Sequence, residues 1–496
     1  MPTREKPSVL EVLRSPRLLL RESLAGLVVA IALVPEAISF SFVAGVDPRV
    51  GLCSSFVMAM VIAVVGGRPA MVSASTAAVA VVVAPVAREH GLDHLLATVV
   101  LGGLVQILLA WAGVARLMRF VPRSVMVGFV NSLATLMLMA QLPHLVDVPW
   151  PVYALVGAGI VVMILTPRLT TLVPAALVSV VLVTAAAVSL GVDVPTVGEE
   201  GALPDSLPTP GLPQVPVTWQ TLRLLAPYAL TMAVVGLMES LMTAKLVDEI
   251  TDTRSSKTRE AWGQGVANIV SGLFGGMGGC AVIGQTMMNV RSNGARTRVS
   301  TFAAGLFLML LSVGLGDLVG RIPVAALVAV MVVVGVSTID WHSLRPATIR
   351  RLPRSETFVM LATLGVVLVT RNLAIGVVSG VVVAALLFVR RVAHFVTVTR
   401  TVQDTPDGPV ARYRVEGELL FASSNELTTQ FEYADDPERV VVDLSASHVW
   451  DVSSVAALDV IETRYTQHGK SVRFEGMNPA TARFHGRLSG SLRPLA

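Results

Sequence analysis

The chain has 496 residues, of which 53% are hydrophobic and only 15% are charged, and its formal net charge is +4. A soluble protein of this length needs more charged surface, so the composition excludes a soluble globular enzyme and indicates a protein that crosses the membrane many times. We attribute the small positive charge to cytoplasmic loops and not to nucleic-acid binding.

The first predicted elements are membrane-spanning helices, each of which needs about 20 apolar residues. They follow a basic, polar segment over 1–21 that lacks the features of a cleavable signal peptide. The first seven are expected near 22–45, 49–66, 70–87, 94–115, 122–142, 150–166 and 172–190. After a Pro-rich, acidic loop over 191–221, a second half over 222–399 is expected to place seven more near 222–247, 260–275, 279–291, 299–316, 322–340, 355–370 and 373–396.

Loop charges predict the orientation, because cytoplasmic loops are rich in Lys and Arg. The residues before the first span include Arg4, Lys6, Arg14, Arg17 and Arg21, and basic residues recur in every second loop after it. The central loop contains Asp193, Glu199, Glu200 and Asp205 and has no Lys or Arg. We therefore expect both termini in the cytoplasm and a multi-pass protein of a bacterial-type inner (plasma) membrane.

Two pairs of motifs predict an internal repeat. "LVPEAISF" in span 1 aligns with "GLMESLMT" in span 8 and places Glu36 over Glu239. "GGRPAMVSAST" before span 3 aligns, with one gap, with "GGMGGCAVIGQT" before span 10. Because seven is an odd number of spans, the second half must enter the membrane from the opposite side. Such inverted repeats, with interrupted helices near the middle of the bilayer, are typical of secondary transporters.

The Gly-rich breaks predict an anion site. Spans 3 and 10 are short, and if each is an extended entry followed by a half-helix, two helix N-termini meet at one point. A helix N-terminus carries about half a positive charge and binds anions. We expect Gly278 and Gly279 to let the backbone approach the ligand. Hydroxyl donors are expected from Ser73, Ser75, Thr76 and Thr286.

The carboxyl group of Glu36 lies in the middle of a span, where a charge costs at least about 2.5–3.5 kcal/mol. Burial favours the neutral form of a carboxyl group, which donates a hydrogen bond to an anion instead of repelling it. Proton and anion binding then favour each other, as symport requires. A permanently neutral, structural Glu36 is the alternative. Glu239 could act in the same way or join two domains, and Glu239 with Thr243 one turn on could instead ligate Na⁺.

The composition changes near residue 400. "ARYRVEGELLFASSNELTTQF", "RVVVDLSASHVWDVSSVAALDVIETRYTQHG" and "KSVRFEGMN" predict the order strand, helix, strand, helix, strand. One helix is expected to end at Gly469. Residues 400–496 are therefore predicted to be a small cytoplasmic α/β domain.

With these motifs the chain resembles the sulfate permease (SulP) family of anion transporters. "ALVPEAISFSFVAGVDPRVGL" is similar to the family's span 1, and "GGMGGCAVIGQTMMNVRSNGART" is similar to its span 10. The resemblance implies fourteen spans as a 7+7 inverted repeat followed by a cytoplasmic STAS domain. It also implies a core of spans 1–4 and 8–11 that moves against a gate of spans 5–7 and 12–14 in elevator fashion, and a homodimer.

The resemblance further implies which residues bind the substrate. Glu36 stands where many members have Gln, and Phe40 is an aromatic residue one turn later. The other implied binding residues are Ala70, Met71 and Ser73 in span 3, Glu239 and Thr243 in span 8, and Gly279, Cys280 and Ala281 in span 10. Glu239 and Thr243 resemble the sodium site of bicarbonate carriers, whereas the carboxyl group at Glu36 favours proton coupling through Glu36 and Glu239.

The STAS-like part departs from the sigma-factor regulators, which have Asp-Ser-Ser-Gly with a phosphorylated serine. Here "WDVSSVAA" moves the aspartate, Asp451, one place back and puts Val455 in place of the glycine. We therefore expect Ser453 and Ser454 to cap the following helix instead of serving as phosphorylation sites.

The sequence thus predicts a proton-coupled symporter of a small anion, with a dicarboxylate such as fumarate implied by resemblance alone. Sodium-coupled bicarbonate transport, proton-coupled sulfate transport, nucleobase:proton symport and an anion channel remain alternatives. We expect no enzyme activity, no cofactor, no metal site and no nucleic-acid partner. Cys53 and Cys280 are read as small hydrophobic residues and not as a disulfide framework.

Overall fold

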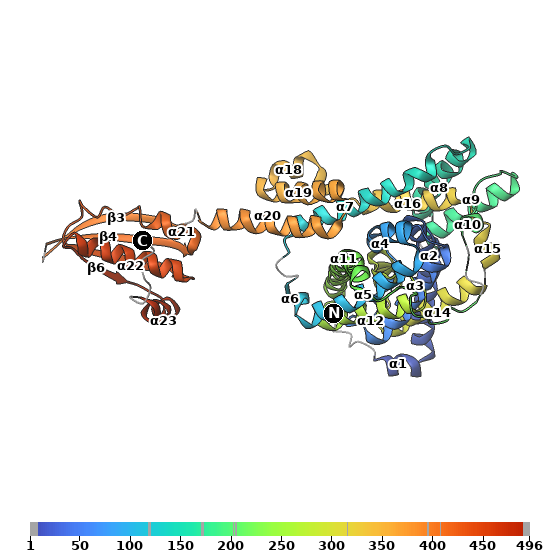
Figure 1. Cartoon of the computed structure of the whole chain (residues 1–496), viewed down its shortest axis with the longest axis horizontal. Coiled ribbons are helices and arrows are strands. Elements are labelled where there is room, and N and C mark those ends of the chain that lie inside the picture. The colour runs from blue at the N-terminus through green and yellow to red at the C-terminus, as the bar shows by residue number, and fades with distance from the viewer. Residues whose placement is uncertain are drawn as a thin grey trace. The chain divides into compact units, whose positions relative to one another are not determined.

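The computed structural model describes residues 8–489 apart from 118–120, 170–172, 202, 204–205, 315, 394–395 and 407. Arg4, Lys6 and Asp205, which the orientation argument used, lie outside these described residues. The chain forms two compact units, Met1–Val381 and Val382–Ala496, and each is described by itself below (Figure 1).

The first half of the membrane unit contains the seven predicted segments. They are α2 (Pro16–Ala44), α3 (Pro48–Val65), β1 (Ser73–Ala74) with α4 (Ala77–His90), α5 (Leu92–Trp111), α7 (Arg123–Gln141), α8 (Trp150–Leu169) and α9 (Ala175–Ser189). The short α1 (Val9–Arg14) precedes them, and α6 (Val114–Leu117) and the 3₁₀ turn η2 (Leu142–Leu145) lie in connections.

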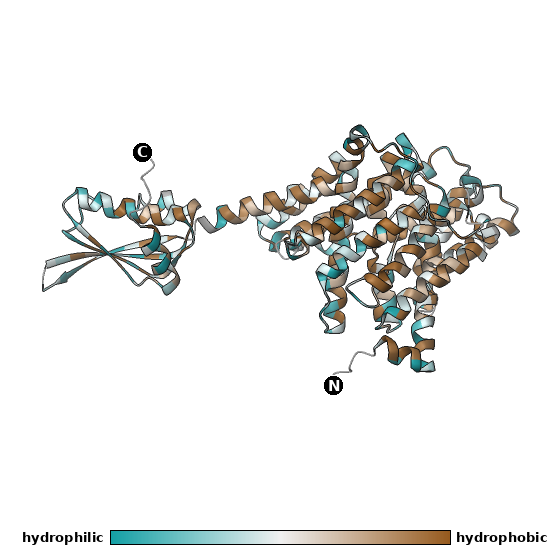
Figure 2. Cartoon of the chain, turned by 60° about the horizontal axis from the view of Figure 1, so that its bottom comes forward, coloured by the Kyte–Doolittle hydropathy of each residue, from teal (hydrophilic) through white to brown (hydrophobic). Residues whose placement is uncertain are grey.

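The second half contains the other seven. They are α11 (Trp219–Thr251), α12 (Lys257–Leu273), β2 (Cys280–Ala281) with α13 (Ile283–Met287) and the π-helical η3 (Met288–Ser292), α14 (Arg298–Gly314), α16 (Val324–Thr338), α19 (Arg354–Thr370) and α20 (Leu373–Ala393). Connections hold α15 (Gly316–Gly320), α17 (Trp341–Leu344) and α18 (Pro346–Arg351). Seven helices among the described residues are long and apolar enough to cross a membrane individually, and most of the helical ribbon of this unit carries the brown of hydrophobic residues in Figure 2. The predicted 7+7 arrangement is confirmed.

Helix packing separates the membrane unit into the two predicted groups. In the core group, α2, α3, α5, α11, α12 and α14 pack mainly on one another, whereas α7, α8, α9, α16 and α19 form the gate group. Glycine makes the closest crossings possible. A Cβ at Gly103 of α5 would lie 2.5 Å from the carbonyl oxygen of Gly265 of α12, and a Cβ at Gly265 would lie 2.5 Å from that of Gly103. Membrane helices associate through such small residues because lipid provides no hydrophobic driving force between them.

The central segment predicted as a loop is fastened to the gate group. Thr196 forms an isolated β-bridge with Pro323, and Val197 N donates to the Ile322 carbonyl at 2.9 Å. The short α10 (Val197–Glu200) packs on α15, where Gly198 and Gly320 approach closely. Further along, Gly211 N donates to the carbonyl of Leu273, at the end of the core helix α12, at 2.8 Å. The segment is therefore anchored to both groups.

The C-terminal unit is a four-stranded sheet with helices. Its strands are β3 (Thr397–Thr405), β4 (Gly408–Leu419), β5 (Arg439–Val449) and β6 (Ser471–Glu475), in the order β3-β4-β5-β6, with β3 antiparallel to β4 and the other pairs parallel. The helices are α21 (Phe421–Leu427), α22 (Val452–Gln467) and α23 (Pro479–Leu488). The predicted order from β4 to β6 is confirmed, and α22 ends before Gly469, which has a φ of 74°. Sequence reasoning missed β3 and α23.

The expectation that Ser453 and Ser454 cap α22 is wrong. The cap is Asp451, whose carboxylate accepts hydrogen bonds from Ser454 N at 2.9 Å and from the Ser454 hydroxyl at 2.8 Å. Ser454 is fully buried and Ser453 is exposed. The shift of the aspartate by one position moves the capping role to it, because a carboxylate is a strong acceptor for the free amide groups of a first turn.

Candidate functional site

The two broken spans meet as a short antiparallel pair of strands. Ser73 lies opposite Ala281, and Ala74 lies opposite Cys280. One residue further, Val282 N donates to the Val72 carbonyl at 2.9 Å. These backbone bonds satisfy polar groups that lipid cannot, which is why extended chain is tolerated here. The predicted extended entries of spans 3 and 10 are therefore confirmed.

Each strand leads directly into a half-helix. The first intrahelical bond of α4 joins Ala80 N to the Thr76 carbonyl at 2.9 Å, and that of α13 joins Thr286 N to the Val282 carbonyl at 3.0 Å. The amide groups at 77–78 and at 283–285 come before these bonds. Val282 provides no side-chain cap, and α13 continues directly into η3. Two sets of amide donors thus begin at the crossing point, and amide groups of this kind at helix starts are suited to binding an anion.

Gly278 and Gly279 are required at the strand crossing, and their expected role in the approach of the backbone to a ligand stays a prediction. A Cβ at Gly279 would lie 1.9 Å from the Ala74 carbonyl oxygen, so no larger residue fits. Gly278 has a φ of 72°, which favours glycine. Asn268 of α12 accepts from Gly279 N at 2.8 Å and donates to the Gly279 carbonyl at 3.1 Å, and so fixes this turn.

The four hydroxyl groups predicted to contact the ligand are already bonded within the protein. Ser73 accepts from Gln264 Nε2 at 2.7 Å, Ser75 and Ser55 share a bond of 2.7 Å, Thr286 accepts from Val72 N at 3.0 Å, and Thr76 lies 3.1 Å from Cys280 Sγ. Short hydroxyl side chains next to a strand are well placed to satisfy its neighbours. These residues hold β1 and β2 in the core group.

Glu36 lies in the middle of α2, which continues through Pro35 without a break. Ser39 donates to the Pro35 carbonyl at 2.7 Å in the next turn. The Gln285 side chain, in the first turn of α13, lies near the Glu36 side chain. Phe40 is buried one turn further along α2. The structure therefore connects the carboxyl group of Glu36 to the start of the second half-helix.

Glu239 occupies the matching position on α11. Cys280 Sγ donates to Glu239 Oε2 at 2.9 Å, and Ala281 N donates to the hydroxyl of Ser240 at 3.0 Å. The hydroxyl of Thr243 donates to the Glu239 backbone carbonyl at 2.8 Å and not to its carboxylate. Glu36 thus lies at the half-helix of the other repeat, whereas Glu239 is bonded to the strand β2 of its own repeat.

Ala70 and Met71 form the entry to β1. Ala70 has a φ of 62°, unusual for a residue with a side chain. Its carbonyl accepts from Asn289 Nδ2 at 2.9 Å, and that of Met71 accepts from the Thr301 hydroxyl at 3.2 Å. Both side chains are buried, and Met71 packs with Ala244 and Ala281. Most of the predicted binding residues therefore lie in or next to the crossing, and several of their side chains are bonded within the protein.

Sequence reasoning missed a polar stripe on α12. Glu260, Gln264 and Asn268 are spaced four residues apart and are fully buried. Glu260 accepts from the Gly67 and Arg68 amides at 2.7 and 2.9 Å. Gln264 donates to Ser73 of β1, and Asn268 accepts from the amide of Gly279, directly before β2. Three polar residues at helical spacing in a predicted span indicate buried polar partners. The stripe could therefore have been predicted from this spacing. Gln285 was missed for lack of such a pattern.

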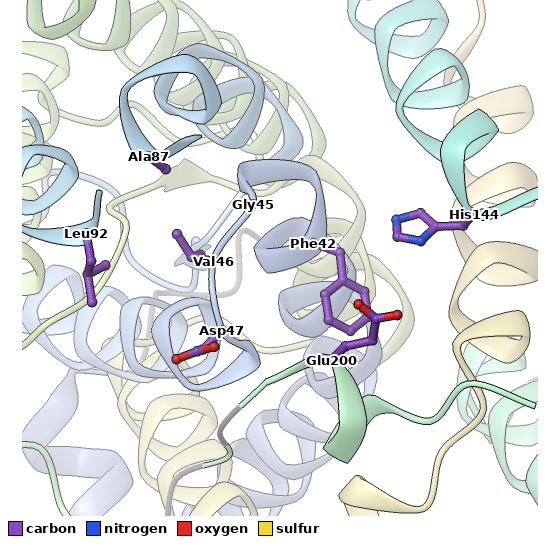
Figure 3. Close-up of a pocket in the computed structure, with 8 residues that line it drawn as sticks. All are labelled: Phe42, Gly45, Val46, Asp47, Ala87, Leu92, His144 and Glu200. Atoms are coloured by element: carbon purple, nitrogen blue, oxygen red, sulfur yellow. The ribbon is translucent and has the colours of Figure 1, made fainter. Parts of the chain in front are cut away.

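A cavity lies away from this crossing. A space of about 430 Å³ is lined by Phe42, Gly45, Val46, Asp47, Ala87, Leu92, His144 and Glu200 (Figure 3). It is located where α2 ends, and Figure 3 shows His144 and Glu200 on its gate side, near Phe42. None of the predicted binding residues lines it. Among the residues that the structure describes, no cluster of His, Cys, Asp and Glu could hold a metal ion.

Residues 19–156 and 147–363 match the sulfate permease family, and residues 401–488 match the STAS domain. The chain belongs to the sulfate permease family. Among its relatives in this family, YbaR of Bacillus subtilis, provisionally named a sulfate transporter, is 46% identical over 461 residues, 93% of this chain and 95% of that protein. The bicarbonate transporter BicA of Picosynechococcus is 26% identical over 490 residues, 88% of this chain and 85% of that protein.

Solved structures agree with the family fold. SLC26A9 superposes with a TM-score of 0.81 at 17% identity, covering 98% of this chain and 90% of that one. The transmembrane domain of a cyanobacterial BicA superposes with a TM-score of 0.64 at 23% identity, covering 75% and 98%. The predicted membership of the sulfate permease family and the predicted fold, a multi-pass helical membrane domain followed by a STAS domain, are confirmed. The family consists of transporters and not of enzymes.

Proposed function

We propose that this protein is a secondary active transporter that carries a small anion together with a proton. The observation that supports this most directly is the crossing of β1 and β2, which brings two half-helix starts together with one carboxyl group at each. The middle turns of α2, α4, α11 and α13 contain no Lys or Arg. The positive potential at the crossing therefore comes from helix N-termini, which suit an anion of low charge.

The two carboxyl groups supply the coupling. When ionised, Glu36 and Glu239 oppose an anion at the crossing, and when protonated they remove that repulsion and can donate hydrogen bonds. Each bound proton therefore raises the affinity for the anion, and by linkage the anion raises the affinity for the proton. Because Glu36 interacts with Gln285 of α13, the first residue to test for coupling is Glu36.

Alternating access follows from the two packing groups. The crossing belongs entirely to the core group, so the core can move against the gate as one body, in elevator fashion, and carry the site with it. A homodimer fixed through the gate would hold the second body still. We place the N- and C-termini in the cytoplasm of a cell with an inner (plasma) membrane, with the central segment outside.

The most specific part of the proposal is the class of anion that is carried. A carboxyl group at Glu36, where many family members have Gln, favours a proton-coupled dicarboxylate such as fumarate. Sulfate or bicarbonate is the second candidate, supported by the names of YbaR and BicA. Neither candidate requires a cofactor.

The test is uptake into proteoliposomes with radiolabelled fumarate, oxalate, sulfate and bicarbonate, each under an imposed pH gradient and separately under a sodium gradient. We expect accumulation of one carboxylate driven by the pH gradient alone. Accumulation of bicarbonate driven only by sodium would replace proton coupling with sodium coupling. Flux that never exceeds equilibrium under either gradient would indicate a channel and overturn the proposal.

A further inference from the structure

The side chains around Cys280 form a chain of hydrogen bonds from Glu239 to the start of α4. Cys280 Sγ lies 2.9 Å from Glu239 Oε2 and 3.1 Å from Thr76 Oγ1. Thr76 Oγ1 in turn accepts from Val79 N at 3.4 Å and caps α4. Cys280 is fully buried and Thr76 nearly so. The chain thus connects a carboxyl group on α11, through β2, to the first turn of a half-helix from the other repeat.

The hydrogens in this chain have a fixed direction while Glu239 is ionised. A carboxylate only accepts, so the single hydrogen of the Cys280 thiol must point to Glu239. The sulfur then accepts from the Thr76 hydroxyl. The Thr76 hydroxyl oxygen accepts from Val79 N, and its own hydrogen is donated to the sulfur. In this state Thr76 has no hydrogen to offer a ligand.

Protonation of Glu239 at Oε2 reverses both bonds. The carboxyl O–H donates to the sulfur, the thiol turns to donate to Thr76 Oγ1, and the Thr76 hydrogen is released. No proton moves beyond Glu239, since the other two hydrogens only reorient. The released O–H lies at the cap of α4, next to the amide groups of Ala77 and Ala78, which precede the first intrahelical bond.

We propose that Cys280 and Thr76 are positioning residues that report the protonation of Glu239 to an anion bound at the start of α4. This inference rests on the proposed function for its anion, but not for the reversal of the chain itself. It adds to charge repulsion a second coupling device, in which one proton on α11 creates one additional donor on α4.

Other titratable groups on the helices that pack against α11 lie away from Glu239. On α12, Glu260 is bonded to the Gly67 and Arg68 amides and to Gln264. The remaining titratable or charged side chains lie near the ends of their elements; on α4, α5, α12 and η3 they are Arg88, Glu89, His90, Asp93, His94, Lys257, Arg259 and Arg291. The only titratable side chain bonded to the Glu239 carboxylate among the described residues is that of Cys280.

The infrared S–H stretching band of Cys280 tests the reversal directly. The chain has two cysteines, so a Cys53→Ala protein leaves Cys280 as the one thiol. A carboxylate is a stronger acceptor than a neutral hydroxyl. We therefore expect the band to move to higher frequency as pH falls and Glu239 takes up its proton. The shift should disappear in Cys53→Ala/Glu239→Gln and persist in Cys53→Ala/Glu36→Gln.

Transport tests the consequence. We expect the KM for fumarate, or for sulfate if fumarate is not carried, to fall with falling pH in the unmodified chain. Cys280→Ala removes the sulfur that accepts from Thr76 while Glu239 is ionised, so the Thr76 hydroxyl is free to donate at any pH. KM should therefore fall about tenfold at high pH, the value of about one hydrogen bond to a charged group, with little change at low pH. Cys280→Ser and Thr76→Ser, which keep a donor and an acceptor in place, should restore the pH profile.

A pH-independent S–H band, or a shift that survives Glu239→Gln, would overturn the inference whether or not transport occurs. A Cys280→Ala protein with the pH profile of the unmodified chain would also overturn it. If no anion in the panel is transported, the proposed function fails, and the infrared titration still decides whether the hydrogen-bond chain reverses.

Discussion

Ala74 and Cys280 lie opposite each other in the two-stranded pair at the crossing, although 206 positions separate them in the chain. Each belongs to a different repeat, and each is followed within three residues by the start of a half-helix. The pair therefore sets the distance between the two sets of helix-start amides. Any substitution that disturbs this pair is expected to affect anion binding more strongly than the packing of the outer helices.

Gly279→Ala tests the crossing. Its Cβ would lie 1.9 Å from the Ala74 carbonyl oxygen, a backbone atom that cannot move aside alone. We expect loss of transport by more than about tenfold and a destabilisation of several kcal/mol, as for other overpacked sites, measured as a lower Tm in detergent. Gly284→Ala is the control for stability, since a Cβ there meets nothing within 4 Å. Equal Tm values for the two variants would contradict the described pairing.

Glu36→Gln tests the coupling. An amide keeps the shape and hydrogen-bonding capacity of a protonated carboxyl group but cannot exchange a proton. We expect anion affinity within about threefold of that of the unmodified chain, and no accumulation in response to a pH gradient. A 1:1 symporter can reach about tenfold accumulation per pH unit, because one unit corresponds to about 1.36 kcal/mol. Proteoliposomes with an imposed pH gradient provide the measurement, and unchanged accumulation by the variant would remove Glu36 from the coupling.

Tyr465→Phe tests a buried cluster in the STAS domain. The hydroxyls of Tyr465 and Tyr413 donate to Asp436 Oδ2 at 2.6 and 2.7 Å. Burial, followed by the hydrogen bond to Asp436, raises the pKa of Tyr465 well above its usual range. The folded state therefore favours the neutral phenol, so this stability is complete below the ordinary tyrosine pKa of about 10 and is lost as pH rises above it.

We expect Tyr465→Phe to destabilise the domain by about 1–3 kcal/mol at pH 8, because Asp436 loses a buried donor. The variant should also lose less stability than the unmodified chain between about pH 8 and pH 11. Thermal unfolding of the full chain at both pH values gives the comparison. Tyr153→Phe in the membrane unit, whose hydroxyl donates to the Leu145 carbonyl, is the matched control and should leave the STAS transition unchanged.

Asp451→Ala tests the cap of α22. The carboxylate accepts two hydrogen bonds from Ser454, and loss of such a cap costs about 0.5–2 kcal/mol. Ser453→Ala removes an exposed hydroxyl from the same turn and should change stability by less than about 0.5 kcal/mol. Urea unfolding of the STAS transition distinguishes them. A larger effect from Ser453 would return the capping role to the serines.

The sequence was sufficient for the spans and the repeat because apolar length and the alignment of Glu36 with Glu239 are properties of local sequence. It also located the breaks, since glycine clusters inside apolar segments are typical of interrupted membrane helices. It could not identify the protein partners of the Ser73 and Thr286 hydroxyls, because those partners lie some 190 or more positions away in the chain. The same limit concealed Gln285, and the exposed polar pattern of β3 concealed that strand.

The chain passes between core and gate three times, through the connections that contain α6, α10 and α15. Two of these passages are fastened to each other where Gly198 approaches Gly320. A sliding core would therefore pull on both passages at once. The chain between Glu200 and Gly211 can span at most about 36–40 Å when fully extended. This length sets an upper limit on the distance that the core group can move while the connection through α10 stays intact.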